Sequence, residues 1–160
     1  MPSDPLTGVV VGLHVNPNGG VPKHPVSTLQ VHTQGCAGDR QNDRRHHGGP
    51  DRAVCLMAEE VLTGLMGDGH PISPGSTGEN LLIAGIEPTA YAPGVRLNFE
   101  GDVVLEITTD APPCKTIAAS FIDGTFRALS HKRQATVTRW YARVVEEGTL
   151  GLGQSVRRDQ

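Results

Sequence analysis

The sequence contains little of several features that define large classes of proteins. Only 3 of its 160 residues are cysteines, too few for a disulfide framework. No apolar run approaches the length of a membrane helix, and no basic region followed by an apolar stretch marks a signal peptide. With 14 basic and 17 acidic residues, the net charge of −3 gives no general attraction to nucleic acid or membrane. These absences predict a cytoplasmic protein with no nucleic-acid or membrane partner.

Aromatic residues are also scarce, at 4%, whereas 20 glycines and 12 prolines are many for this length. Such a composition favours short strands and turns over long helices. The length suits one domain with its own core, spanning residues 1–160. The sequence therefore predicts a single, mainly β domain that forms a small closed or partly closed barrel. A β-sandwich is the alternative.

Hydrophobic patterns predict the individual elements. Apolar or alternating runs predict strands at 8–15, 27–35, 95–99, 102–110 and 137–145, with a hairpin formed by the third and fourth. Glycine-rich and polar stretches predict loops at 16–25 and 36–52 and a turn at 146–150.

One helix is predicted at 50–69, capped by Asp51 and ended by Gly67. Its apolar stripe consists of Val54, Met57, Val61, Leu62, Leu65 and Met66. A second, short helix is expected directly after Cys114.

Residues 110–117, DAPPCKTI, place a cysteine on a stiff stretch of chain directly after a predicted strand. Pro112 and Pro113 fix φ and remove two backbone donors, so the Cys114 thiol is held at a defined place. Lys115 follows, and a neighbouring ammonium favours the thiolate, the form that binds soft metals and attacks electrophiles. The alternative is a small buried hydrophobe, the commoner fate of a free cysteine.

A basic loop precedes the predicted helix. It carries Arg40, Arg44, Arg45, His46, His47 and Arg52 around Gly48 and Gly49. Backbone N–H groups at a helix start, glycines that allow close approach and arginines together form an anion site, for which phosphate is the natural ligand. The alternative is a solvated loop whose charge is balanced by nearby aspartates.

A second glycine loop, PGSTGEN at 74–80, ends in Glu79 and Asn80. A carboxylate beside an amide offers acceptors and donors that can recognise a ring with amino and N–H groups. The alternative is an ordinary turn in which Asn80 bonds to its own backbone. The remaining cysteines, Cys36 and Cys55, have no partner at zinc-site spacing and are expected to be packing residues.

Six stretches together resemble the MOSC family, which includes the C-terminal domain of molybdenum-cofactor sulfurases and reductases of N-hydroxylated purines and amidoximes. In chain order they are GGVPK (19–23), GDRQND (38–43), HGGPDRAV (47–54), PGSTGENL (74–81), PPCKTI (112–117) and RWYARVVEEGTLGLGQSV (139–156). The resemblance implies a MOSC-like β-barrel with a few short helices that binds molybdenum cofactor (molybdopterin).

The resemblance also implies site residues. Cys114 matches the functional cysteine of the family, which ligates molybdenum or carries sulfur. Other motif positions around the cofactor site are Lys23, His47, Gly48, Gly49, Arg52, Glu79 and Asn80. In one departure, many relatives have an arginine three residues before the cysteine, where this chain has Ala111.

Three functions are open for Cys114. The leading prediction is an oxidoreductase that reduces N–OH to N–H, with Cys114 as molybdenum ligand and a separate protein as electron donor. The second is a carrier that delivers sulfur or the cofactor to a transfer partner. The third is a hydrolase with Cys114 as nucleophile and His47 or His131 as its base.

Overall fold

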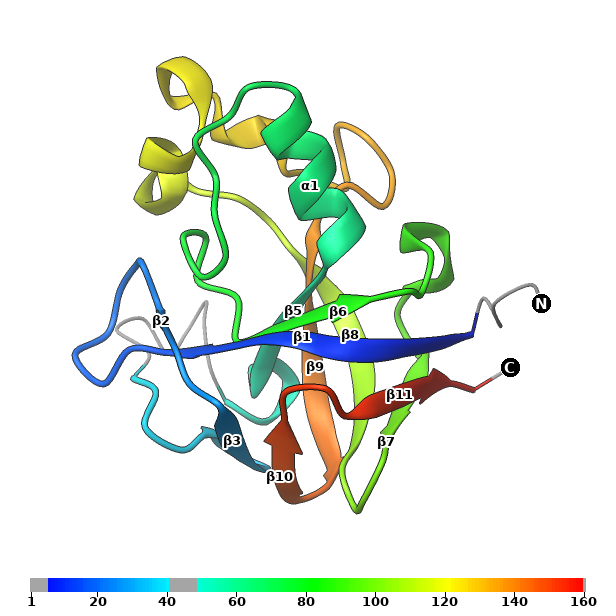
Figure 1. The fold of residues 1–160 in the computed structure, drawn as a ribbon. Coiled ribbons are helices and arrows are strands. Elements are labelled where there is room, and N and C mark those ends of the chain that lie inside the picture. The colour runs from blue at the N-terminus through cyan, green and yellow to red at the C-terminus, as the bar shows by residue number, and fades with distance from the viewer. Residues whose placement is uncertain (1–5, 41–48, 160) are drawn as a thin grey trace.

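The chain folds into a closed β-barrel, as the computed structural model of residues 6–40 and 49–159 shows (Figure 1). Seven strands form a ring in the order β11-β7-β8-β9-β5-β6-β1, and β1 pairs with β11 to close it. A two-residue strand, β2, extends the sheet beside β1, and β10-β3-β4 form a second, three-stranded sheet that packs on the same core. The predicted barrel is confirmed, and the closed ring excludes the sandwich.

The elements of the described chain are short. The strands are β1 (Thr7–Val15), β2 (His24–Pro25), β3 (Thr28–His32), β4 (Gly35–Cys36), β5 (Val54–Ala58), β6 (Leu81–Ala84), β7 (Arg96–Phe99), β8 (Val104–Ala111), β9 (Arg139–Glu146), β10 (Gly148–Gly151) and β11 (Ser155–Arg158). The α-helix is α1 (Glu59–Gly67), and the 3₁₀ helices are Pro50–Arg52, Pro88–Ala90, Lys115–Ser120, Ile122–Gly124 and Phe126–Ala128. None of the described helices is long and apolar enough to cross a membrane.

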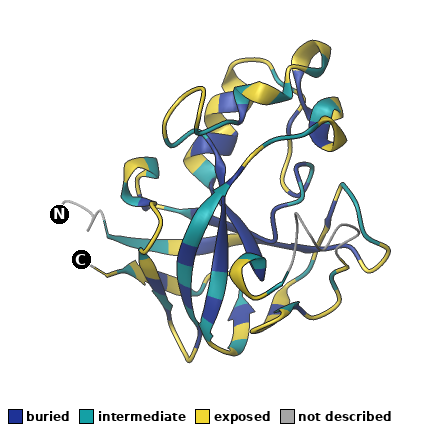
Figure 2. Ribbon diagram, turned by 180° about the vertical axis from the view of Figure 1, so that it is seen from behind, coloured by how far each residue is buried: buried dark blue, intermediate teal, exposed yellow. Residues whose placement is uncertain are grey.

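Apolar side chains fill the barrel. Strand residues that point inward include Leu56, Leu105, Ile107 and Trp140, all buried in one continuous core. Figure 2 shows buried residues following the strands of the ring, while exposed residues gather in the loops and 3₁₀ helices. Because side chains alternate along a strand, the neighbours of these core residues lie on the outer face of the barrel wall.

The long helix predicted at 50–69 is wrong in its first half. Residues 54–58 form β5, which pairs in parallel with β6 and antiparallel with β9, and only Glu59–Gly67 is helical. All five residues of β5 are buried, so the strand lacks the alternation that distinguishes a strand from a buried helix. Parallel neighbours need a crossover, and α1 lies in the connection from β5 to β6.

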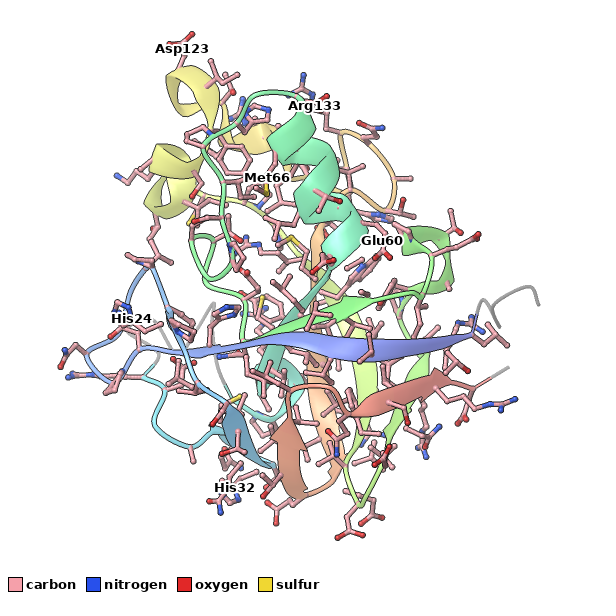
Figure 3. All side chains as sticks on the ribbon, viewed as in Figure 1. His24, His32, Glu60, Met66, Asp123 and Arg133 are labelled. Carbon is pink, nitrogen blue, oxygen red and sulfur yellow. The ribbon has the colours of Figure 1, made fainter. Side chains whose placement is uncertain are left out.

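The cap, end and apolar stripe predicted for this helix have different outcomes. Asp51 lies in a 3₁₀ helix and makes no capping bond, while the predicted end at Gly67 is confirmed. Met66, expected in the apolar stripe, is 48% exposed on α1 (Figure 3). Glu60, in the first turn, accepts a hydrogen bond from the Gly85 N–H (2.8 Å) and so fastens α1 to the end of β6.

Other predicted strands differ at their ends. The run 27–35 forms β3 and then turns into β4. Most of the turn predicted at 146–150 is strand instead, since β9 ends at Glu146 and β10 begins at Gly148. Strand β11, which closes the barrel, was not predicted. The hairpin of β7 and β8 and the short helix after Cys114 are confirmed, the latter as a 3₁₀ helix.

Candidate functional site

The candidate site lies on the outer face of the barrel wall formed by β5, β9 and β8. Cys55 pairs with Tyr141, and Tyr141 pairs with Thr109, so the three form a row across these strands. In the adjacent row, Arg139 pairs with Ala111. Cys55, Ala111 and Tyr141 form a small apolar cluster separate from the main core.

Loops cover this face and enclose a cavity of about 650 Å³. Its lining includes Gly20, Val21, Lys23, Arg40, Arg52, Cys55, Thr77, Gly78, Thr109, Asp110, Pro112, Pro113, Cys114, Thr116, Ile117, Arg139 and Tyr141. These residues come from the barrel wall and from four loops that are distant in sequence. A more open hollow of about 740 Å³ adjoins the cavity and shares Arg52 and Thr109 with it.

Cys114 lies at the wall of this cavity. It follows the end of β8, has an extended backbone and precedes the 3₁₀ helix Lys115–Ser120, whose first hydrogen bond runs from the Ile117 N–H to the Cys114 carbonyl (3.1 Å). The residue is half-buried and lines the cavity. Lys115, in contrast, is exposed and outside the described lining.

The other two cysteines are buried. The Cys36 thiol donates to the Ala53 carbonyl (3.5 Å), and burial raises its pKa to about 12. Burial also raises the pKa of Cys55 to about 11, although this residue touches the cavity. Both therefore remain protonated at neutral pH, in agreement with the packing role expected for them.

Cationic side chains dominate the charge of the lining. Arg40 is exposed, and the guanidinium of Arg52 lies 5.6 Å from the centre of the Tyr141 ring. Burial raises the pKa of Tyr141, so its phenol stays neutral at physiological pH. Lys23, 7% exposed, also lines the cavity, but its ammonium forms an ion pair with Asp39.

Glu79 is fully buried and outside the cavity lining. Its carboxylate accepts hydrogen bonds from the Gly75 N–H (2.7 Å) and from the Thr77 hydroxyl (2.8 Å). These bonds fix the loop whose residues Thr77 and Gly78 do reach the cavity. The structure therefore gives Glu79 a place beneath the cavity wall, and a direct contact with a ligand stays a prediction.

Asn80 is likewise buried and turned toward protein partners. Its amide oxygen accepts from the Cys55 N–H (3.0 Å), and its amide nitrogen donates to the His14 carbonyl (3.1 Å) and to Asp39 (2.9 Å). Both amide hydrogens are thus used inside the protein. The sequence predicted that this amide recognises a ligand ring, but no amide hydrogen is left to donate to one.

Sequence reasoning overlooked Arg139, which the structure places in the cavity wall, 5% exposed. It lies directly across the ladder from Ala111, the position at which the family resemblance expects an arginine. The available signal was a charged residue directly before the apolar run 140–142, two positions before Tyr141 and hence on the same face.

Two of the predicted site residues, His47 and Gly48, lie outside the described residues. Gly49 is described, with a φ of 82° that favours glycine. It lines the adjoining hollow.

Comparison with known proteins supports the family resemblance seen in the sequence. The family model described as "MOSC domain" matches residues 43–157. The protein YflK of Bacillus subtilis (strain 168) is 30% identical over 145 residues, which cover 86% of this chain and 62% of that protein. The chain thus spans less than two thirds of the length of this relative.

Solved structures show a similar fold. The YuaD protein of Bacillus subtilis superposes with a TM-score of 0.74 at 18% identity, covering 95% of each chain. YiiM of Escherichia coli superposes with a TM-score of 0.71 at 19% identity, covering 96% of this chain and 70% of that one. Because the family model covers most of the chain and the fold agrees, this protein belongs to the MOSC domain family.

Proposed function

We propose that this protein binds molybdenum cofactor in the cavity beside Cys114 and acts as an oxidoreductase on N-hydroxylated compounds. The observation that carries the proposal is a half-buried thiol at the wall of a cavity whose lining contains four cationic side chains. MOSC domains are associated in general with binding of this cofactor, and Cys114 matches their functional cysteine.

The lining fits the chemistry of such a ligand. A thiolate is a soft ligand that suits a molybdenum centre, and a pterin cofactor bears an anionic phosphate that suits guanidinium groups. Cys114 would ligate the metal, while Arg40, Arg52 and Arg139 would face the anionic part. The described residues contain no group of three His, Cys, Asp or Glu side chains placed to hold a metal ion, and the predicted role of Cys114 is that of a single protein ligand.

The proposed reaction converts N–OH to N–H. The N–O bond breaks, two electrons and two protons are taken up, and the oxygen leaves as water. The bound cofactor would supply the two-electron redox chemistry. A separate protein must donate the electrons, and solvent supplies the protons. The chain itself would orient the substrate, with Val21, Pro113 and Ile117 as apolar parts of the wall.

A carrier of sulfur or cofactor is the second candidate. The observation that favours it is the partial exposure of Cys114, because a transfer partner must reach the sulfur atom. For the hydrolase, the described residues offer no comparable support, and His47, one of its two candidate bases, lies outside them. His131 lies outside the cavity lining, its Nδ1 accepts from the Thr136 N–H (2.9 Å), and its ring packs against Trp140.

Metal analysis tests the proposal. The protein is purified from a host that makes molybdenum cofactor, and molybdenum per chain is measured by mass spectrometry together with reduction of an aryl amidoxime. We expect molybdenum and turnover in the wild type and neither in Cys114→Ala. Cys36→Ala is the matched control, since its thiol is buried away from the cavity and its loss leaves molybdenum in place.

Two outcomes contradict the oxidoreductase. Molybdenum content and turnover in Cys114→Ala equal to those of the wild type would show that Cys114 is not the metal ligand. A wild-type protein without molybdenum, but with a persulfide on Cys114 detected by mass spectrometry, identifies the carrier instead.

A further inference from the structure

Arg139 is a buried cation whose hydrogen bonds to the described residues all go to backbone carbonyls. The side chain is 5% exposed, and it belongs to the first residue of β9, on the same face as Tyr141. Its partner across the ladder is the uncharged Ala111, and in the glycine loop it contacts the Thr77 carbonyl. The buried carboxylate of that loop, Glu79, bonds to Gly75 and Thr77 and not to Arg139. Removing a guanidinium from water is unfavourable unless an opposite charge or a full set of acceptors compensates for it.

The acceptors that the protein offers to Arg139 are few. Nη1 donates to the Thr77 carbonyl (2.6 Å), and Nη2 donates to the carbonyls of Ala111 (3.3 Å) and Pro112 (3.2 Å). The Nε–H is buried and has no acceptor among the described residues. A guanidinium has five N–H groups, so at least two are left without a protein acceptor there.

Other cationic side chains of the protein have carboxylate partners. Lys23 pairs with Asp39, while Arg96 and Arg143 share the carboxylate of Glu106. For Arg139, no carboxylate lies within ion-pair distance in the described part of the chain. The missing counter-charge would therefore come from outside the protein, through the cavity that Arg139 lines.

We infer that Arg139 binds an oxyanion, a carboxylate or phosphate group, of the molecule that occupies the cavity beside Cys114. The inference rests on the proposed function in taking this cavity as the ligand site. The small Ala111 side chain directly across the ladder leaves room for the guanidinium. Bonds to the carbonyls of residues 111 and 112 tie the guanidinium to the segment that carries Cys114, so an anion bound there lies close to the thiol.

The test uses Cys114 as a reporter in cofactor-free protein. Iodoacetate and iodoacetamide alkylate the thiol by the same reaction, in which the C–S bond forms, iodide leaves and the thiol proton goes to solvent. Only iodoacetate carries a carboxylate. The ratio of the two rates at Cys114, measured by mass spectrometry, therefore reports anion binding. A change in the exposure of the thiol alters both rates alike and cancels in the ratio.

In the wild type we expect the ratio of the iodoacetate rate to the iodoacetamide rate to exceed that of glutathione, a free thiol. Inorganic phosphate, but not chloride at equal ionic strength, should inhibit the iodoacetate reaction saturably. Arg139→Gln should lower the ratio by about tenfold, the effect of one charged hydrogen bond. Arg139→Lys, which keeps the charge but not the planar donor set, should lie between them. Arg143→Gln is the matched control on the same strand and should equal the wild type.

The oxyanion can belong to the cofactor or to the substrate, and metal content distinguishes these sources. If it is the cofactor phosphate, Arg139→Gln purified from a cofactor-producing host should contain several-fold less molybdenum than the wild type. If it belongs to the substrate, molybdenum is unchanged and KM rises for an amidoxime that bears a carboxylate but not for its neutral analogue.

The alkylation result for the wild-type protein alone can overturn the inference, so the test does not depend on whether the variants fold. A rate ratio equal to that of glutathione, with no protection by phosphate, shows that Arg139 binds no anion. An Arg139→Gln ratio equal to the wild type assigns the preference to Arg40 or Arg52. Absence of molybdenum from the wild type contradicts the proposed function but leaves the alkylation result standing, so the two failures are distinguishable.

Discussion

Asn80 joins three parts of the chain through one side-chain amide, reaching β5, β1 and the Asp39 loop. Asn80→Ala removes one hydrogen-bond partner from the Cys55 N–H and one from the Asp39 carboxylate. Both groups are buried, so water does not replace the lost partner. We expect a loss of about 2–4 kcal/mol in the free energy of unfolding, measured by urea denaturation.

Asn98→Ala is the matched control, because the amide of Asn98 bonds to Asp159 near the surface and its loss should cost less than about 1 kcal/mol. If Asn80→Ala is as stable as the wild type and loses only ligand binding, Asn80 is a binding residue and the structural role is wrong.

His14 makes stability depend on pH. Burial lowers its pKa from the ordinary value of 6.5, and the opposing effect of the nearby Glu79 carboxylate is smaller. The unfolded chain therefore takes up a proton at a higher pH than the folded one. The stabilising contribution is complete above about pH 6.5 and decreases as the pH falls toward the lowered value.

We expect the free energy of unfolding to decrease between pH 7 and pH 5, and to decrease less steeply in His14→Gln. His24→Gln, which removes an exposed histidine on β2, should keep the wild-type slope (Figure 3). A slope unchanged in His14→Gln would show that other groups cause the pH dependence.

At the scale of elements, two glycines respond oppositely to an added methyl group. Gly64 lies inside α1 with nothing within 4 Å of its Cβ position, so Gly64→Ala should stabilise the protein by about 0.5–1 kcal/mol. A Cβ on Gly8 of β1 would collide with the Ala84 carbonyl oxygen of β6. Gly8→Ala should destabilise the protein, and thermal unfolding of both variants checks the opposite signs.

The boundary between β5 and α1 shows why one element was predicted wrongly. An entirely apolar strand followed without a loop by an amphipathic helix has no period of its own, and its residues fit a helical stripe by chance. What makes residues 54–58 a strand is their pairing with β6 and β9, which lie far away in sequence. Strands with alternation or a nearby hairpin partner, such as β1, β7 and β8, were predicted.

At the scale of the whole molecule, closure of the barrel depends on β11. Val156 is 1% exposed and pairs with both Gly8 and Phe99, so it lies where the two ends of the sheet meet (Figure 1). Val156→Asp buries a carboxylate at this seam and should cost more than about 3 kcal/mol. The exposed neighbour provides the control, since Arg157→Asp should change stability by less than about 1 kcal/mol. Similar urea midpoints for the two variants would show that the seam does not support the fold.

The sequence by itself determined the fold class and the family, and it predicted Cys114 as the functional cysteine. Turn-rich composition, alternating strands and a proline-fixed thiol are local properties, and local properties can be recognised without coordinates. Only the tertiary structure decided which polar side chains face the cavity. It turned Glu79 and Asn80 toward internal partners and brought Arg139 beside the Cys114 segment, because strand pairing and burial, which connect distant residues, fix where a side chain finds its hydrogen bonds.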